Sequence, residues 1–153
     1  MSDVLTKAQR RLNMSRIKGK NTRPEKLLRG GLFRLGFRFR IHRRDLPGKP
    51  DIVLPKFNTC VFVHGCFWHG HKCSYFKLPQ TRRTFWSAKI AANQKRDERS
   101  HEELLAMGWR VLIVWECALK STNPTKLATL VDQCALFIKN SRSTEKASLQ
   151  ITG

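Results

Sequence analysis

A short segment crowded with cysteine and histidine constrains the fold of this chain more than any other feature. Within ten residues lie His64, Cys66, His69, His71 and Cys73. Thiolates and imidazoles together suit a structural zinc ion, which takes four tetrahedral ligands. Cys66, His71 and Cys73 supply three of them, with His69 as an alternative to His71. The loop predicted from residue 65 to about residue 83 would be poorly ordered without a cross-link. A fourth ligand is therefore expected from elsewhere in the chain. Cys117, just past an apolar stretch, is the best candidate.

Apolar periodicity places this segment inside an α/β domain. Thr22, Pro24 and Glu25 form a capping-box pattern that begins a helix ending near Gly36. The pattern predicts strands at 37–42, 51–54, 59–64 and 109–115, and further helices at 84–107 and 124–140. A strand, a helix and a strand in succession require a parallel pair. We therefore predict a three-layer fold with a central mixed sheet flanked by helices.

Length and charge bound the organisation of the chain. Its 153 residues suit one domain, and 41% hydrophobic residues are enough for a core. We expect residues 1–20 to form a flexible basic arm, 21–140 the domain, and 141–153 a frayed tail. The formal net charge is +19, and +12 of it falls on residues 1–50. So strong a charge indicates nucleic acid as the partner, with an anionic membrane as the weaker choice.

Several classes of protein are excluded by what the sequence lacks. No stretch approaches the roughly 20 apolar residues that cross a bilayer, and the N-terminus has no apolar signal region. We expect a cytoplasmic, nucleoid-associated protein, in which the five cysteines are free thiols or metal ligands rather than disulfides. Cys60 falls in a predicted strand and Cys134 on the apolar face of a helix. Both are interpreted as small core residues.

One carboxylate and the strand after it carry a resemblance to a nuclease superfamily. Asp51 follows Pro50 and opens a strand, and the next strand ends at His64. This arrangement resembles the PD-(D/E)xK nucleases, in which an Asp begins one strand while an acid and a Lys stand two apart on the next. Here Phe62 stands where the second acid is expected, and His64 stands where the Lys is expected.

A wider set of motifs makes the resemblance more specific. Asp51, the segment 64–73, Phe85-Trp86 and the segment 109–117 together are similar to the very-short-patch mismatch repair endonucleases. The resemblance covers roughly residues 10–120. It implies a restriction-endonuclease-like fold and a nick on the 5′ side of the T in a T:G mismatch, which arises when 5-methylcytosine is deaminated. It also allows a matchmaker ATPase as a partner, and we expect a monomer.

The chemistry of phosphodiester hydrolysis assigns roles to particular residues. The reaction needs an activated water and charge relief at the phosphate, and Mg²⁺ supplies both. Asp51 is the expected carboxylate ligand of Mg²⁺, and the resemblance implies the backbone carbonyl of Val63 as the second protein ligand. His69 is the candidate base, because an imidazole titrates near pH 6.5. His64 is expected to hold the phosphate or the transition-state charge.

Two acidic residues on helices are expected to assist the reaction. Glu25 on the first helix is a candidate for orienting metal-bound waters, with a purely capping role as its alternative. Asp97 on the long helix is a candidate for orienting His69, with a solvated helix position as its alternative. Both expectations depend on how the helices pack against the strands.

Aromatic residues and the basic arm predict how DNA is held. Trp86 lies beside Arg82 and Arg83, and Phe67 and Trp68 are adjacent in the polar loop. The resemblance assigns all three to insertion between base pairs, which costs least at a mismatch, with ordinary core positions as the alternative. The part of the arm expected in the minor groove contains Met14, Arg16, Ile17 and Lys18. Affinity should then fall steeply with salt. The alternatives are a non-catalytic zinc module that binds distorted DNA, or a nuclease of the same fold with another DNA target.

Overall fold

A computed structural model of the chain describes residues 6–9, 22–73, 76–120, 123–140 and 147–152. The predicted minor-groove residues Met14, Arg16, Ile17 and Lys18 lie outside these ranges. The helices are α2 (Arg23–Arg34), α3 (Arg83–Ala106), α4 (Glu116–Leu119) and α5 (Pro124–Lys139). A 3₁₀ turn spans Pro55–Phe57. The strands are β1 (Arg40–Ile41), β2 (Ile52–Leu54), β3 (Thr59–His64), β4 (Arg110–Trp115) and β5 (Ser148–Ile151).

The strands form one sheet in the order β1-β2-β3-β4-β5. The pairs β1–β2 and β2–β3 are antiparallel, whereas β3–β4 and β4–β5 are parallel. The crossover between β3 and β4 is made by α3. These pairings confirm the predicted mixed sheet and its parallel pair.

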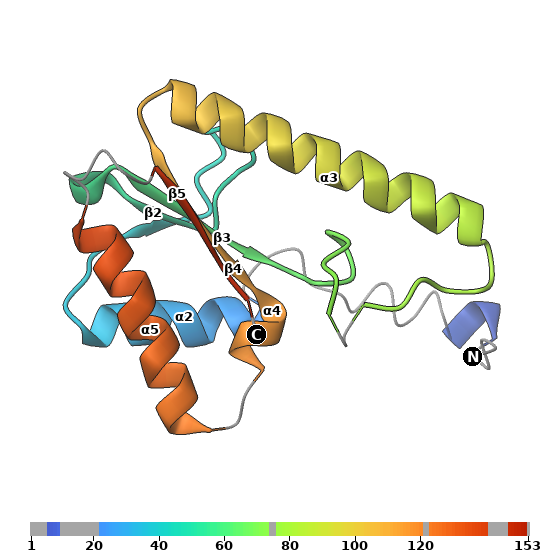
Figure 1. The fold of residues 1–153 in the computed structure, drawn as a ribbon, viewed down its shortest axis with the longest axis horizontal. Coiled ribbons are helices and arrows are strands. Elements are labelled where there is room, and N and C mark those ends of the chain that lie inside the picture. Colours follow the sequence, from blue (N-terminus) through green and yellow to red (C-terminus); the bar gives the residue numbers. More distant parts are fainter. Residues whose placement is uncertain (1–5, 10–21, 74–75, 121–122, 141–146, 153) are drawn as a thin grey trace.

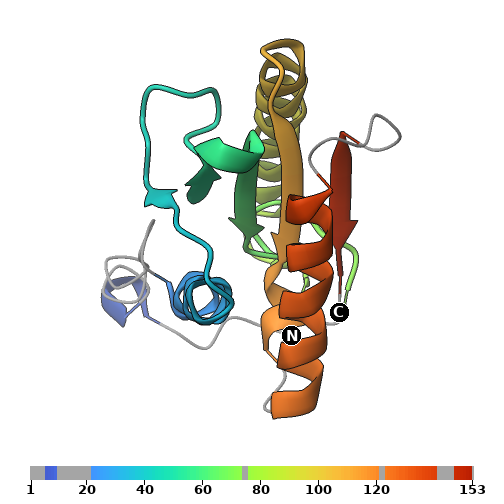
Figure 2. The same ribbon diagram turned by 90° about the vertical axis from the view of Figure 1, so that its left-hand side faces the viewer.

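Helices cover both faces of the sheet (Figure 1), and Figure 2 shows α2 and α5 on the side away from α3. One core cluster joins Leu28 and Leu32 of α2 and residues of α5 to the sheet. A second cluster joins Leu104 of α3 to alternate residues of β3 and β4. Because successive strand residues point to opposite faces, β3 contributes Val61 to the first cluster and Phe62 to the second. The predicted three-layer α/β architecture is confirmed.

Helix α2 begins as its sequence predicts. The Thr22 side chain accepts a hydrogen bond from the Glu25 amide, and a proline stands in the first turn. Gly31 is required by packing, because an added Cβ would lie 2.6 Å from Cγ2 of Val131 on α5. The glycine that lowers helix propensity is therefore the one that lets α2 and α5 cross closely.

Two predictions about strands were wrong. The tail is not frayed over Ser148–Ile151, which pair in parallel with β4 as β5. Only Leu149 and Ile151 supply apolar side chains there, too few for the alternation to be recognised in sequence. The strand predicted at 37–42 is limited to Arg40–Ile41, because Phe37 turns into the core and its ring packs 5.5 Å from that of Phe57. No helix in the described ranges is long and apolar enough to span a membrane.

Candidate functional site

Asp51 is placed where the start of β2 meets the end of β3. Its amide donates to the carbonyl of Val61 at 3.0 Å, which continues the antiparallel ladder. Its carboxylate oxygen Oδ2 accepts a hydrogen bond from the amide of Val63 at 2.7 Å. The carboxylate thus lies beside the backbone of Val63, the residue whose carbonyl the sequence predicts as a second metal ligand.

The surroundings of Asp51 make its negative charge costly. Burial is the largest cause of a pKa raised from 3.8 to about 7. The hydrogen bond from Val63 lowers the pKa, the nearby carboxylate of Glu25 raises it, and His69 and Arg29 lower it. A buried carboxyl group with a pKa near 7 is a common feature of sites that bind a cation or move protons.

A cluster of three imidazoles reaches this carboxylate through His69, which is close enough to lower the pKa of Asp51. The His64 side chain at the end of β3 is buried, and its ring stacks on that of His69 with centroids 3.9 Å apart and 5° between planes. His101 of α3 lies with its ring centroid 5.7 Å from that of His64. Burial is the main reason that the pKa of His64 falls to about 3, so this imidazole is neutral at ordinary pH.

Asp97 of α3 orients the outer imidazole of the stack. Its Oδ2 is hydrogen-bonded to Nδ1 of His69. Burial opposes ionisation of Asp97, but the bond to His69 and the charges of the neighbouring imidazoles lower its pKa overall. The carboxylate therefore stays ionised beside His69. An ionised carboxylate that fixes one ring nitrogen leaves the other nitrogen to exchange a proton with a substrate or a water.

The stacking geometry bears on what this cluster can bind. Ligand atoms of His64, His69 and Asp97 lie within 4.8 Å of one another. The two imidazole planes are nearly parallel, however, so their nitrogen lone pairs run side by side and do not converge on one point. Without rotation of a ring, the group is suited to proton transfer and hydrogen bonding rather than to holding one ion between both rings.

Glu25 reaches the same region from α2. Its side chain is buried, and Oε2 lies 3.3 Å from Nε2 of His42. The hydroxyl of Thr22 donates to its other oxygen at 3.4 Å. The carboxylate is near enough to Asp51 to raise the pKa of that residue. Glu25 therefore has contacts beyond the helix cap.

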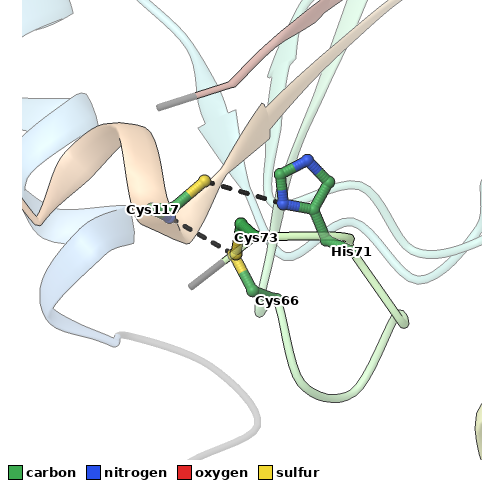
Figure 3. Close-up of side chains that lie close together, drawn as sticks. All are labelled: Cys66, His71, Cys73 and Cys117. Carbon is green, nitrogen blue, oxygen red and sulfur yellow. Dashed lines mark hydrogen bonds between the residues drawn. The ribbon is translucent and has the colours of Figure 1, made fainter. Parts of the chain in front are cut away.

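Four side chains of the kinds that can ligate a metal meet at a second place, next to the imidazole cluster. Sequence analysis predicted this set, and Figure 3 shows its members Cys66, His71, Cys73 and Cys117 close together. The Cys117 sulfur lies 3.6 Å from Nδ1 of His71, and the Cys117 amide donates to the Cys66 sulfur at 3.4 Å. Their ligand atoms are within 4.8 Å of one another. Three thiols and one imidazole at such separations fit a tetrahedral metal ion.

The positions of the other histidine and cysteines show that they do not belong to this four-residue cluster. His69 points to Asp97 while His71 joins the sulfur atoms, so the structure selects His71 over the alternative that the sequence left open. Cys60 and Cys134 are fully buried in the two core clusters, as predicted. Burial raises the pKa of both thiols to about 12.

Helix α3 holds the loop of residues 65–73 in position. The Asn93 side chain donates to the Trp68 carbonyl at 2.9 Å, and the Gln94 side chain donates to the His69 carbonyl at 3.2 Å. Gly70 has a positive φ, and an added Cβ would lie 2.8 Å from Cγ2 of Ile90. Together with the bond from Asp97, these contacts from one side of α3 fix the loop that presents His69.

The three predicted aromatic residues form one cluster at the start of α3. Ring centroids of Phe67 and Trp68 are 5.2 Å apart, and both lie within 5.8 Å of the ring of Trp86. All three side chains are half-buried rather than core residues. Neighbouring Phe85 is 43% exposed, with the Arg82 guanidinium 4.3 Å from its ring centre. Aromatic faces beside a cation are suited to stacking on bases.

Sequence reasoning missed two histidines. His42 falls at the end of the strand predicted at 37–42, whereas in the structure a positive φ of 54° brings its ring to Glu25. His101 follows Asp97 by one helical turn, a spacing that puts both on one side of α3. This four-residue spacing in the sequence could have shown that His101 lies on the same side of the helix as Asp97. The Phe62 ring that stands at the expected second-acid position packs 4.9 Å from His101.

A mixed sheet between helices, with a carboxylate just before one strand and an imidazole at the end of the next, defines a restriction-endonuclease-like DNA nuclease. A family profile described as DNA mismatch endonuclease Vsr matches residues 2–75. The chain belongs to this family, because it is also similar over most of its length to members that share the description or a related one.

Three relatives document the similarity. The type II nicking enzyme V.XorIIP of Xanthomonas oryzae is 53% identical over 119 residues, which cover 78% of this chain and 88% of the relative. The DNA mismatch endonuclease Vsr of Escherichia coli is 48% identical over 120 residues, covering 78% and 77%. The type II nicking enzyme V.NmeAIP of Neisseria meningitidis is 46% identical over 121 residues, covering 79% and 86%. The chain is accordingly a DNA endonuclease that nicks one strand.

Proposed function

We propose that this endonuclease hydrolyses one DNA strand on the 5′ side of the T in a T:G mismatch and so begins short-patch repair. The observation that carries the proposal is the closeness of Asp51 to His69, whose charge lowers the pKa of Asp51 and whose ring stacks on that of His64. The family membership supports mismatched DNA as the substrate. The T:G identity rests on the resemblance in the sequence motifs.

The two metal sites take different ions. Asp51 and the backbone carbonyl of Val63 offer oxygen ligands, which suit Mg²⁺. The near-neutral pKa of Asp51 fits this assignment, because a cation would offset the cost of its buried charge. Bound there, Mg²⁺ supplies charge relief at the phosphate and a more acidic water. Thiols and an imidazole at the second site suit a structural Zn²⁺, which deprotonates the cysteines that it binds.

The residues of the chain then divide the chemistry of hydrolysis. His69 acts as the base: its Nδ1 is held by Asp97, and Nε2 takes the proton from the attacking water. His64 stays neutral because of its burial and donates a hydrogen bond to the phosphate. Glu25 orients water near Asp51, a role supported by its closeness to that carboxylate. A general base contributes about 10²–10⁴ in rate, so His69 should be important without being the whole of catalysis.

Recognition of the mismatch is assigned to the aromatic cluster. Phe67, Trp68 and Trp86 enter the base stack, and the cost of unstacking is lowest where pairing is already weak. The basic arm, whose key residues lie outside the described ranges, enters the minor groove. The enzyme acts as a monomer in the cytoplasm at the nucleoid, with a matchmaker ATPase as a repair partner.

Matched DNA duplexes test the proposal. Wild-type protein is incubated with labelled duplexes that carry either T:G or T:A at one position, with and without Mg²⁺. We expect a single nick 5′ to the T only in the T:G duplex and only with Mg²⁺. Binding without any nick would favour a non-catalytic module, and equal nicking of both duplexes would indicate a nuclease with another target.

A further inference from the structure

A cavity of about 420 Å³ lies between α2 and α5. These two helices pack on the face of the sheet away from α3 (Figure 2). Its apolar lining comes from both helices and includes Leu27, Leu35, Leu127, Ala128 and Val131. Leu35 is 46% exposed although it is a large hydrophobic residue. Such a groove between two packed helices has the size and lining of a binding site.

Helix α2 presents two different faces, and only one of them lines the groove. Arg23, Leu27 and Arg34 fall on the groove side, whereas Glu25 lies on the other side with its carboxylate near Asp51. At 3.6 residues per turn the groove residues are centred opposite Glu25. An occupant of the groove would therefore contact the helix that carries Glu25 without covering the catalytic site.

The charge of the rim indicates what the groove accepts. Arg23, Lys26 and Arg34 line it, against one acidic residue, Asp132. Cationic groups around an apolar floor complement a segment with acidic side chains around apolar ones. We propose that this groove docks an amphipathic, acidic helix of a partner protein.

DNA and the chain's own arm fit the groove less well. A phosphate backbone needs only cations, and it would leave the floor of Leu27, Leu127 and Val131 against a charged surface. The start of α3, which contains Trp86, lies far from α5 (Figure 1). The arm of residues 1–20 is itself basic and would be repelled by the same rim.

Peptide selection against the full-length protein tests the proposal. Displayed random peptides of about 15 residues, roughly four helical turns, are selected on wild-type protein and depleted on Ala128→Glu, which places a carboxylate on the groove. We expect enriched peptides with Asp and Glu around apolar residues at i, i+3 or i+4, and i+7. In fluorescence anisotropy they should bind Ala128→Glu at least about tenfold more weakly, since it adds a like charge and buries a carboxylate.

A matched variant separates the groove from general charge effects. Gln133→Glu adds the same charge to an exposed position of α5 outside the groove, and it should bind the peptides like wild type. Nicking of the T:G duplex at the wild-type rate by Ala128→Glu shows that the variant is folded. The proposal is overturned if no peptides are enriched, if the enriched peptides are not acidic, or if both variants bind them equally. It is also overturned if Ala128→Glu weakens duplex binding as strongly as peptide binding, because the groove would then be a DNA surface.

Discussion

Replacing Asp51 by Asn should stabilise the protein at neutral and alkaline pH while it removes nicking. In the unfolded chain this carboxyl titrates near its ordinary pKa of 3.8, whereas burial raises the pKa to about 7 in the folded protein. Between these values the folded state binds a proton that the unfolded state has lost. Stability therefore falls as pH rises through this window, and above about pH 7 the full penalty is present.

The size of the effect follows from the pKa difference. The folded and unfolded pKa values differ by about three, and each pH unit corresponds to about 1.4 kcal/mol. Ionising Asp51 therefore costs the folded protein at most about 4 kcal/mol of stability. Asn is neutral, and its side-chain oxygen can still accept the hydrogen bond from Val63 that the carboxylate accepts at 2.7 Å. We expect the unfolding free energy of Asp51→Asn to exceed that of wild type by about 2–4 kcal/mol at pH 8, and by under about 1 kcal/mol at pH 4.

Urea unfolding at both pH values measures this difference. The buffers contain neither Mg²⁺ nor a chelator, so that an ion held by the Cys66, His71, Cys73 and Cys117 cluster would be retained. Asp132→Asn, at an exposed position of α5, makes the same chemical change without burial and should alter stability little at either pH. An Asp51→Asn protein that is less stable than wild type at pH 8, or equally changed at both pH values, would refute the reasoning.

Other predictions address the metal site, the base, the neutral imidazole and the aromatic cluster. Cys117→Ala should lose the metal found by elemental analysis and much of the stability, whereas Cys134→Ala should keep about one Zn²⁺ per chain; a folded, metal-free Cys117→Ala protein would contradict this. His69→Ala should slow single-turnover nicking by about 10²–10⁴ with T:G binding retained, and an unchanged rate would exclude it as the base. The pKa of His64 is about 3 in the folded protein, against an ordinary value of 6.5 in the unfolded chain. Below pH 6.5 the unfolded state therefore binds a proton that the folded state does not, so stability should fall as the pH drops from about 6.5 to about 3. His64→Gln should reduce this acid sensitivity in urea titrations, and the same slope in both proteins would argue against a buried neutral ring. Trp86→Ala should weaken T:G duplex binding by about 1–3 kcal/mol, measured by anisotropy against Lys95→Ala, an exposed change on the same helix; equal losses would count against stacking.

The sequence was sufficient for elements with strong periodic or chemical signals. The long helix α3, the apolar strand β4 and the capped start of α2 were all predicted close to their observed bounds. The thiol cluster was predictable because cysteine and histidine at short spacing are typical of a zinc site. Cys117 could be placed because a parallel strand brings its end to the same edge as the end of β3.

Other features depend on tertiary contacts that no local pattern records. Strand β5 is stabilised by pairing with β4 rather than by its own composition. His42 reaches Glu25 only because its backbone adopts a left-handed conformation. The stacking of His64 on His69 depends on how α3 holds the loop through Asn93 and Asp97. The groove between α2 and α5 arises from two helices crossing, which neither helix encodes alone.

Cleavage by an Asp51→Ala variant tests the central claim most directly. The variant and the wild-type protein are incubated with a 5′-labelled T:G duplex and Mg²⁺, and binding is followed in parallel by anisotropy. We expect the variant to bind the duplex about as tightly as wild type and to produce no nick. A nick at the same position and a comparable rate would show that this carboxylate does not carry the reaction.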